Sequence, residues 1–572
     1  MNAIGQCEHP GGRVTALERL GERRSTALWL GAIGLAAFGV LFLSALSAPR
    51  PSIFPDEFVY WRLQHSLADS GHFVLFGEHF SPWTFGALYP LRLAPLALLP
   101  LSATALYQHD QAVGCLLFAT AVVPAYLLAR RLLTRRNALL ASALLLVLPS
   151  NMYATRLMTE GLGYPVFLWS LLACWYGLER PGWRPQLLAL TSIVPAALTR
   201  AELAALLPAY ACALLVLRTR RRASVLVASV VVALFLLVVA LVAWDTLLGQ
   251  HGALFGRLSP AAAPAWTLAN LVGLEVYVGV IPFALAAFVF ARWLAGTDVS
   301  RRSLAVLALA LGAWLLLVVG TYVTQRPSTG VYDRYTFYLA PLVLLAFVDW
   351  LEHATALSRR LRIVFALVIL LPLAIPYPTI FTDKWGLAVN VGLLPLFLVH
   401  QGLDWPVFYP LLAVLLAGLA VVVLRALGQD DRRTLVVLTL GALVFTAFLA
   451  HVTNSVVTAQ AGDCLADRHW VERRGVGNAV VVWSGRDRHD AGCATWQSMF
   501  FDPSLDRVYR VGASLGSLEE PRVTISNGQV RLADGRPFRA RYVVSDVPLA
   551  GTVIARDLKS GLRLYDLRRI TG

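Results

Sequence analysis

The chain has 572 residues, of which 57% are hydrophobic and only 15% are charged, and its net charge is +15 at pH 7. A soluble domain has about a quarter of its residues charged, so this composition excludes an ordinary soluble protein and indicates an integral membrane protein. The arginines lie in short clusters between apolar runs, as they do in cytoplasmic loops. No aromatic–basic RNA motif is present, so the charge does not indicate a nucleic-acid partner.

The first apolar run, ALWLGAIGLAAFGVLFLSALS at 27–47, predicts the first membrane span. A crossing helix needs about 20 mostly apolar residues, and this run meets that length. It is longer than the core of a signal peptide, and no persuasive cleavage site follows it. We therefore expect a retained anchor, with residues 1–26 on the cytoplasmic side.

Further apolar runs predict a polytopic α-helical membrane protein of about 13 spans under the length and hydropathy rules. The later candidates are 108–130, 137–150, 161–178, 186–198, 201–217, 224–247, 269–294, 303–323, 335–352, 361–377, 406–425 and 434–452. Arginine clusters such as RRLLTRR at 130–136 and RTRRR at 218–222 recur on one predicted side. That bias makes 186–217 a down-and-back pair. An odd number of spans then places the C-terminal region outside the cell.

From residue 453 onward the chain predicts a small extracytoplasmic α/β domain, 453–572. The run NAVVVWSG at 478–485 indicates a buried strand, and Asn-Gly and Asp-Gly turns separate shorter strands after it. Cys464 and Cys493 are the two cysteines of this region. In an oxidising compartment they are candidates for a disulfide, and the alternative is two free thiols.

The first outer loop, 48–107, begins with SIFPDEFVYWR and predicts a short helix that lies along the membrane surface. Pro55 stands at its first position, and Asp56 and Glu57 follow in its first turn. These acids have two readings: they stabilise the helix start through its dipole, or one of them works as a general base toward a hydroxyl. Adjacent helical residues point about 100° apart, so the pair does not form one bidentate site.

Aromatic side chains are frequent in this loop, and they too allow two readings. Tyr60, Trp61, Trp83 and Tyr89 are placed where they would stack on sugar rings or anchor the loop at the membrane surface. We favour anchoring for these four.

Charged residues recur at the predicted outer ends of later spans, where they usually mark pairing or function. They are Arg156 and Glu160, Arg200 and Glu202, Arg326, Asp333 and Arg334, and Asp383 and Lys384. One interpretation of the Arg–Glu pairs among them is that they serve only to hold the structure together. Several arginines on one side also suit an anionic group, because guanidinium matches phosphate oxygens in bidentate fashion.

Four of these motifs together resemble the GT-C superfamily, whose members are membrane glycosyltransferases that use polyprenyl-phosphate sugars and include the protein O-mannosyltransferases. They are FPDEFVYW in the first outer loop, RLMTEGLGYP at 156–165, LTRAEL at 198–203 and DRYTFYLAPLVLL at 333–345. The resemblance covers roughly residues 25–450, and it identifies 27–452 as a GT-C-like transmembrane domain.

The resemblance implies a catalytic acid at Asp56 and a second acidic position at Glu160. It implies that Arg334 binds the donor phosphate, with Tyr335 beside it, whereas Arg156 and Arg200 match less firmly. Glu57 and Glu160 would then position the acceptor or the loop. Some relatives use a divalent metal ion, Mg²⁺ or Mn²⁺, and others do not. This sequence contains no metal-ligating cluster and does not decide the question.

The function that follows from the resemblance is transfer of a sugar from a polyprenyl-phosphate donor to a hydroxyl of the cell envelope, with inversion. Glycan, lipid and protein acceptors all fit. Two other classes stay open: a transporter of polyprenyl lipids or polysaccharides, and a membrane scaffold whose outer domain binds a glycan or a partner. A transporter is expected to show inverted repeats, and no such halves are visible.

Overall fold

The computed structural model describes thirteen stretches of the chain. They are residues 16–51, 55–75, 78–79, 86–218, 261–324, 330–353, 358–381, 390–461, 464–484, 490–502, 504–512, 521–534 and 537–570. The expected span 224–247 lies outside them, as do Trp83, Arg326, Asp383 and Lys384.

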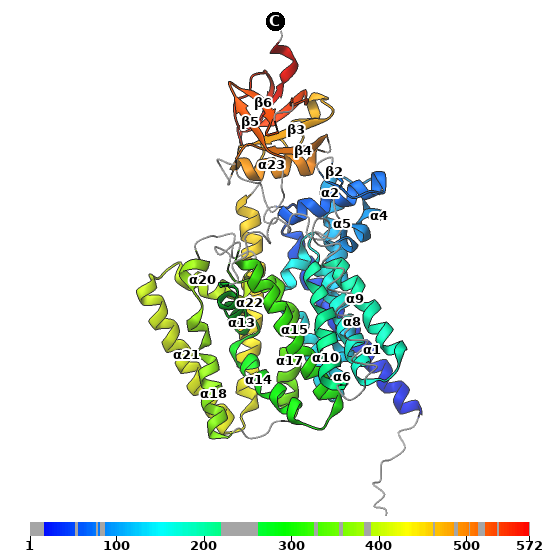
Figure 1. Ribbon diagram of the computed structural model, residues 1–572, viewed down its shortest axis with the longest axis vertical. Helices are drawn as coiled ribbons and strands as arrows, with labels where there is room; N and C mark the ends of the chain where they lie inside the picture. The colour runs from blue at the N-terminus through cyan, green and yellow to red at the C-terminus, as the bar shows by residue number, and fades with distance from the viewer. Residues whose placement is uncertain are drawn as a thin grey trace, which may run out of the picture.

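Most of the described chain forms a bundle of apolar helices, drawn from blue to yellow in Figure 1. Its longer helices are α1 (Ala16–Leu46), α5 (Ala103–Ala119), α6 (Val122–Arg130), α7 (Arg135–Leu146), α8 (Glu160–Glu179), α9 (Trp183–Thr199), α10 (Leu206–Arg218), α13 (Ala263–Val278), α14 (Val280–Ala295), α15 (Val299–Val323), α17 (Ala340–Glu352), α18 (Arg359–Ile369), α21 (Trp405–Gly428) and α22 (Arg432–Ala461). Short turns of helix connect them: η1 (Pro149–Thr155), η2 (Ala201–Ala205), α16 (Asp333–Thr336), η5 (Phe337–Leu339), η6 (Leu371–Ala374), α19 (Tyr377–Ile380), η8 (Val391–Leu393) and α20 (Leu394–His400).

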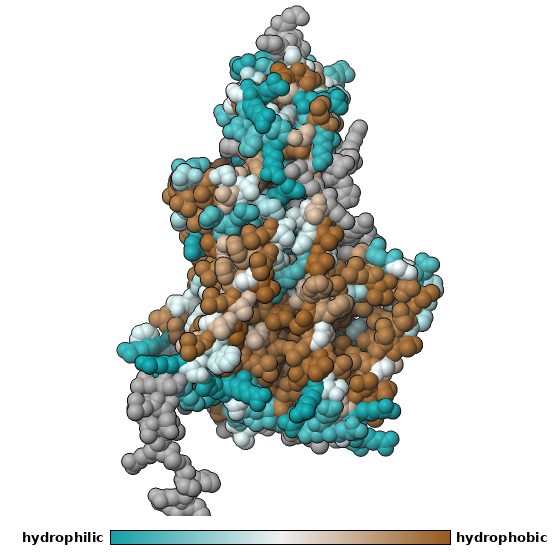
Figure 2. All heavy atoms as spheres, turned by 180° about the vertical axis from the view of Figure 1, so that it is seen from behind, coloured by the Kyte–Doolittle hydropathy of each residue, from teal (hydrophilic) through white to brown (hydrophobic). Residues whose placement is uncertain are grey.

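The bundle has the surface of a multi-pass membrane protein. Among the described residues, seven helices are long and apolar enough to cross a membrane, or up to nine if each of two bent pairs is one span. Large apolar side chains such as Leu35, Val414 and Phe448 are more than half exposed, which is stable only against lipid. Figure 2 shows the resulting hydrophobic belt, with hydrophilic residues above and below it.

Two expected spans are not straight helices. The predicted span 269–294 breaks at Gly279, where α13 and α14 meet at 113°. Gly279 has φ of 87°, a conformation that side chains with a Cβ rarely adopt. The predicted span 137–150 similarly becomes α7 and η1, bent by 61°. The shortness of 137–150 already makes it doubtful as a full straight span. Hydropathy registers the apolar run 269–294 but not the turn inside it, so the bend at Gly279 was not predicted.

The predicted down-and-back pair at 186–217 is present as α9, η2 and α10. The helix α9 ends at Thr199, and Arg200 takes an extended conformation that turns the chain back. Gly86, at the start of the next segment of the first loop, lies against the carbonyl of Thr199, where a Cβ atom would clash. The first outer loop is therefore packed onto the turn that carries Arg200.

Helix α2 (Pro55–Ser70) carries the two acids and lies at the junction between the bundle and the C-terminal region (Figure 1). It is followed by the two-stranded ribbon of β1 (Val74–Leu75) and β2 (Glu78–His79) and then by α4 (Leu88–Ala97). Instead of resting on a membrane surface, α2 is enclosed, since Phe58, Tyr60 and Trp61 are all less than 5% exposed.

The C-terminal region contains a five-stranded sheet above the bundle (Figure 1). Its strands are β3 (Ala479–Trp483), β4 (Leu505–Arg510), β7 (Tyr542–Ser545), β8 (Thr552–Arg556) and β9 (Arg563–Asp566), in the order β4-β3-β7-β9-β8. The first three pair in parallel and the rest antiparallel. A separate ribbon pairs β5 (Val523–Ser526) with β6 (Gln529–Leu532), and short turns η9 (Glu472–Arg474) and η10 (Leu567–Ile570) flank the sheet.

Helix α23 (Asp490–Phe501) crosses from β3 to β4, as expected of a parallel pair. Cys464 and Cys493 form a disulfide with Cα atoms 5.8 Å apart, which ties the chain leaving α22 to the start of α23. All five residues of β3 are buried, in agreement with the apolar run predicted at 478–485.

Candidate active site

The two adjacent acids of α2 point to different parts of the protein. Asp56 faces Arg334, with its Oδ2 2.8 Å from Nη1 of the guanidinium. Glu57 is completely buried and accepts hydrogen bonds from Tyr107 and from the backbone of Leu157. The separation of about 100° between neighbours on a helix accounts for this divergence.

Asp56 belongs to a chain of alternating charges that we call the Arg334 cluster: Asp56, Arg334, Glu160, Arg200 and Glu202. Nε of Arg334 donates to Glu160, and Nη1 of Arg200 contacts the same carboxylate. Nε of Arg200 donates to Glu202. The structure thus brings together residues that stand nearly 280 positions apart in the sequence.

Each member of the Arg334 cluster comes from the end of an element. Asp56 is in the first turn of α2, and Glu160 is the first residue of α8, where the helix dipole favours a negative charge. Arg200 occupies the turn between α9 and η2, and Arg334 lies in the short helix α16 before α17. Helix ends that meet at one level therefore build the cluster.

Burial differs sharply within the Arg334 cluster. The side chain of Glu160 is 0% exposed and that of Arg334 is 7% exposed, whereas Asp56 is 21% exposed. Burying a charge is costly unless it is paired, so Glu160 needs both guanidinium groups that contact it. Asp56 is the most exposed carboxylate of this cluster, since the side chain of Glu202 is 13% exposed.

Tyrosine rings enclose the two guanidinium groups. The ring of Tyr335 lies 5.2 Å from the guanidinium carbon of Arg200, and that of Tyr338 lies 5.9 Å away. The ring of Tyr153 lies 5.7 Å from the guanidinium carbon of Arg334. These are cation–π distances, and they hold the planar cations in fixed orientations.

Arg156 is part of a second group, the Glu57 cluster, which consists of Glu57, Tyr107, Arg156, Asn454 and Thr458. Its Nε and Nη2 donate to Oδ1 of Asn454 at 3.1 and 2.8 Å, and Nη2 also donates to Thr458. Its Nη1 donates to a backbone carbonyl and lies 3.9 Å from Glu57.

The burial of Arg156 does not favour its expected phosphate-binding role. Its guanidinium is 0% exposed and faces protein acceptors, because α22 passes behind η1 and supplies Asn454 and Thr458. Asn454 and Thr458 are not among the site residues predicted from the sequence. They stand four residues apart in an otherwise apolar helix, which places them on one face. This spacing is the sequence feature that could have predicted a buried polar contact.

Burial raises the pKa of Glu57, against the opposing effects of Arg156 and of its hydrogen bonds to Tyr107 and Leu157. The Glu57 cluster joins α2 to α5, to the turn after η1 and to α22. These contacts attach the first turn of α2 to the bundle, and the loop-positioning role of Glu57 stays a prediction. Its complete burial does not favour contact with an acceptor.

The aromatic residues of the first outer loop are packed inside the protein, so the expected anchoring role is wrong for those described. The rings of Tyr60 and Tyr89 meet at 5.2 Å, and that of Trp61 lies 4.3 Å from Phe500 of the C-terminal region. The sequence shows that aromatic residues are frequent in this loop, but it does not show that other elements cover them.

Comparison with known proteins relates the chain to glycosyltransferases. Residues 111–244 match the family model described as dolichyl-phosphate-mannose-protein mannosyltransferase. That range includes Glu160 and Arg200 but neither Asp56 nor Arg334. A comparison with curated protein sequences gave no match.

Solved structures share the architecture at low sequence identity. ArnT from Cupriavidus metallidurans bound to undecaprenyl phosphate gives a TM-score of 0.51 at 15% identity, covering 94% of this chain and 97% of that chain. The chain has the GT-C fold. The apo form of the same ArnT gives a TM-score of 0.49 at 14% identity, covering 95% of this chain and 99% of that chain. An Archaeoglobus fulgidus oligosaccharyltransferase tethered to an acceptor peptide gives 0.33 at 14% identity, with coverages of 60% and 54%.

The resemblance to the GT-C superfamily drawn from the sequence is thereby confirmed. In this GT-C fold the Arg334 cluster lies at the ends of α8 and α16, beside the first-loop helix α2.

A divalent metal ion does not fit the described residues around the Arg334 cluster. Among them, no group of three or more His, Cys, Asp and Glu side chains is arranged to hold a metal ion. The carboxylates of Asp56 and Glu160 already contact guanidinium groups, and a metal ion would have to compete with these cations.

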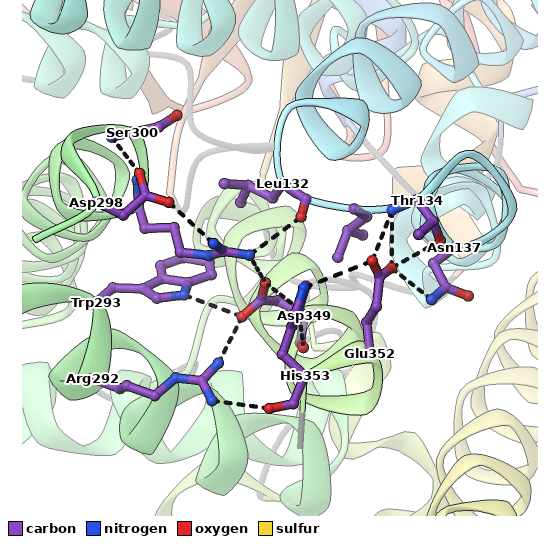
Figure 3. A network of polar contacts seen from close by, with 12 residues as sticks. Leu132, Thr134, Asn137, Arg292, Trp293, Asp298, Ser300, Asp349, Glu352 and His353 are labelled. Atoms are coloured by element: carbon purple, nitrogen blue, oxygen red, sulfur yellow. Dashed lines mark hydrogen bonds and ion pairs between the residues drawn. The ribbon is translucent and has the colours of Figure 1, made fainter. Parts of the chain in front are cut away.

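A second polar network lies at the opposite end of the bundle, where α17 ends (Figure 3). Asp349 is buried and accepts from Arg292 and Arg301 at 2.9 Å and from the indole of Trp293 at 3.2 Å. Three helices of the GT-C bundle, α14, α15 and α17, meet there. Because one buried carboxylate, that of Asp349, accepts from donors on two neighbouring helices, we interpret this network as a link between helix ends and not as a second site.

Proposed function

We propose that this protein is a membrane glycosyltransferase that moves a sugar from a polyprenyl-phosphate donor to a hydroxyl of a cell-envelope acceptor, with inversion. One observation carries the proposal: a partly exposed acid, Asp56, is paired with the buried Arg334 in a cluster of two arginines. The GT-C fold supports the same reaction class. The related ArnT structure is bound to undecaprenyl phosphate, which supports a lipid-phosphate donor here.

In the proposed reaction, the acceptor oxygen attacks the anomeric carbon from the face opposite the phosphate. The carbon–oxygen bond to the phosphate breaks, and its electron pair stays on the polyprenyl phosphate. Asp56 accepts the proton of the attacking hydroxyl as general base. The protein mainly contributes position and charge, because a phosphate is a good leaving group once its charge is matched.

The pairing of Asp56 with Arg334 gives this step an electrostatic logic. The Arg334 cluster has three carboxylates and two guanidinium groups, for a formal charge of −1. When Asp56 takes up the proton it becomes neutral, and Arg334 no longer shares its charge with that carboxylate. At the same moment negative charge grows on the leaving phosphate, which Arg334 is then able to stabilise.

The remaining members of the cluster have supporting roles in this proposal. Glu160 holds Arg334 and Arg200 in place, and Tyr335 keeps the plane of Arg200 fixed. Because the described residues do not fit a divalent metal ion, no step is assigned to one. We further propose that residues 453–572 and the mouth of the Arg334 cluster lie on the extracytoplasmic side and residues 1–26 in the cytoplasm.

The experiment that tests this function uses the purified full-length protein in lipid nanodiscs. It is incubated with a panel of polyprenyl-phosphate hexoses and pentoses together with a cell-envelope extract as acceptor. Release of polyprenyl phosphate and a new glycosidic bond are followed by mass spectrometry. We expect release with at least one sugar. A second assay uses the same protein in proteoliposomes with labelled polyprenyl-phosphate sugars. If these lipids cross the membrane unchanged and no glycosidic bond forms, the protein is a transporter and the proposal is wrong.

A further inference from the structure

The helix that carries Asp56 is covered by the C-terminal region on the side away from Arg334. Phe58 and Arg62 lie four residues apart and therefore share one face of α2. On the helical wheel that face is roughly opposite Asp56, because six positions correspond to about 240° of rotation. Both residues contact the C-terminal region.

Arg62 makes the polar part of this contact. Its Nη2 donates to the carbonyls of Met499 at 2.7 Å and Asp502 at 3.4 Å, and also to that of Leu505. Met499 is in the last turn of α23, where the final carbonyls of a helix have no partner inside the helix. A cation is favoured at that end by the helix dipole. Arg62 thus caps α23 from a different part of the chain.

Aromatic rings make the apolar part. Phe58 packs against Trp496 with ring centroids 4.8 Å apart, and Trp61 packs against Phe500 at 4.3 Å. Phe500 also meets Tyr107 of α5 at 5.5 Å, edge to face. The side chain of Phe500 therefore contacts α2 and the membrane bundle at once, and it leaves α2 little freedom to rotate.

The opposite side of α2 is fixed by the bundle. Glu57 bonds to Tyr107 and Leu157, and Gln64 donates to the buried Asp110 at 2.7 Å. With Arg62 on the other side, α2 is held between two bodies. Asp56 lies about 9 Å along the helix from Arg62, at 1.5 Å per residue, so a small tilt at Arg62 displaces the acid.

We propose that the last turn of α23, with Arg62 as its partner on α2, is a clamp that positions Asp56 for catalysis. The C-terminal region is then a positioning element of the active site and not a separate binding module. Arg62 is a positioning residue, since it acts through α2 and not on the substrate. The inference rests on the proposed function only for its effect on sugar transfer.

The test compares Arg62→Ala and Arg62→Lys with Arg541→Ala in the full-length protein in nanodiscs. Arg541 pairs with Asp566 on the sheet of the same region, so its variant controls for loss of an arginine there. Hydrogen–deuterium exchange of the α2 amides is one readout. The other is kcat and KM for the polyprenyl-phosphate sugar that the wild type turns over.

We expect Arg62→Ala to raise exchange in α2 at least tenfold and to lower kcat at least tenfold, with KM for the donor changed less than threefold. Arg62→Lys, which keeps a positive charge and a donating nitrogen, should recover part of both effects, and Arg541→Ala should show neither. Unchanged exchange in Arg62→Ala would overturn the clamp. Raised exchange with normal kcat would overturn its role in catalysis. If the wild type transfers no sugar, the proposed function fails, and the exchange data still decide whether the clamp exists.

Discussion

Exposure separates the two acids that contact Arg334 more clearly than their chemistry does. Asp56 and Glu160 both contact Arg334, but Glu160 is fully buried between two guanidinium groups, whereas Asp56 is 21% exposed. A group that exchanges a proton with a substrate has to reach it, and a group that holds two cations in place does not. The structure therefore favours Asp56 as the reacting acid and Glu160 as its support.

This distinction predicts different stability effects. Glu160→Gln leaves Arg334 and Arg200 without their shared buried counter-charge, and breaking a buried pair costs about 3–5 kcal/mol. Asp56→Asn removes a partly exposed partner while Glu160 still faces Arg334, so its cost should be about 1 kcal/mol or less. Thermal unfolding of the detergent-solubilised proteins measures both. Equal midpoints for the two variants would contradict the assignment.

At the scale of elements, α2 is the part on which the site depends. Its acids, aromatic residues and arginine each face a different neighbour, so the helix is fixed by the bundle on one side and by α23 on the other. Most helices at a membrane surface have one free polar face, and α2 does not. The Glu57 cluster makes the contacts that attach α2 to the bundle.

The buried Glu57 predicts a pH-dependent stability. Burial raises its pKa above the ordinary 4.5, so folding favours the protonated carboxyl. The contribution is fully present below pH 4.5 and is lost as the pH rises through the raised pKa. Glu57→Gln should therefore lose less stability than the wild type between pH 5 and pH 8, as followed by unfolding midpoints. Glu22→Gln, at an exposed position of α1, is the control. Parallel curves for Glu57→Gln and the wild type would refute the interpretation.

At the scale of the molecule, the two ends differ in character. The C-terminal sheet lies beyond one end of the bundle (Figure 1). Arg334 lies in α16, just before α17, and Asp349 lies in the last turn of α17, so the two polar groups are at opposite ends of that helix. Helix α22 has 30 residues and connects the two ends; at 1.5 Å per residue it spans about 45 Å, enough to cross a bilayer.

The sidedness of the ends is open to direct measurement. Leu558, 86% exposed on the C-terminal region, and Arg433, exposed at the start of α22, mark opposite ends. With the proposed orientation, Leu558→Cys in intact cells should react with a membrane-impermeant maleimide, and Arg433→Cys should react only after the membrane is opened. The wild-type protein, which has neither introduced cysteine, gives the background level of maleimide labelling. The reverse pattern would invert the proposed topology.

Sequence reasoning reached the main features that local chemistry records. Apolar runs gave the helical bundle, the buried strand β3 was visible in its composition, and the positions of Asp56, Glu160 and Arg334 followed from charged residues at helix ends. What it could not give depends on contacts between distant segments. The bend at Gly279, the capture of Arg156 by Asn454 and the covering of α2 by α23 each require knowing which elements meet.

The most direct test of the account is the turnover of Asp56→Asn beside Asp69→Asn, an exposed acid at the far end of the same helix. Both variants are assayed in nanodiscs with the donor sugar that the wild type uses, after their unfolding midpoints are shown to match it. We predict that Asp56→Asn lowers kcat at least a thousandfold, because both general-base catalysis and the release of Arg334 are lost, whereas Asp69→Asn keeps normal turnover. Sugar transfer by Asp56→Asn at the rate of the wild type would contradict the central claim.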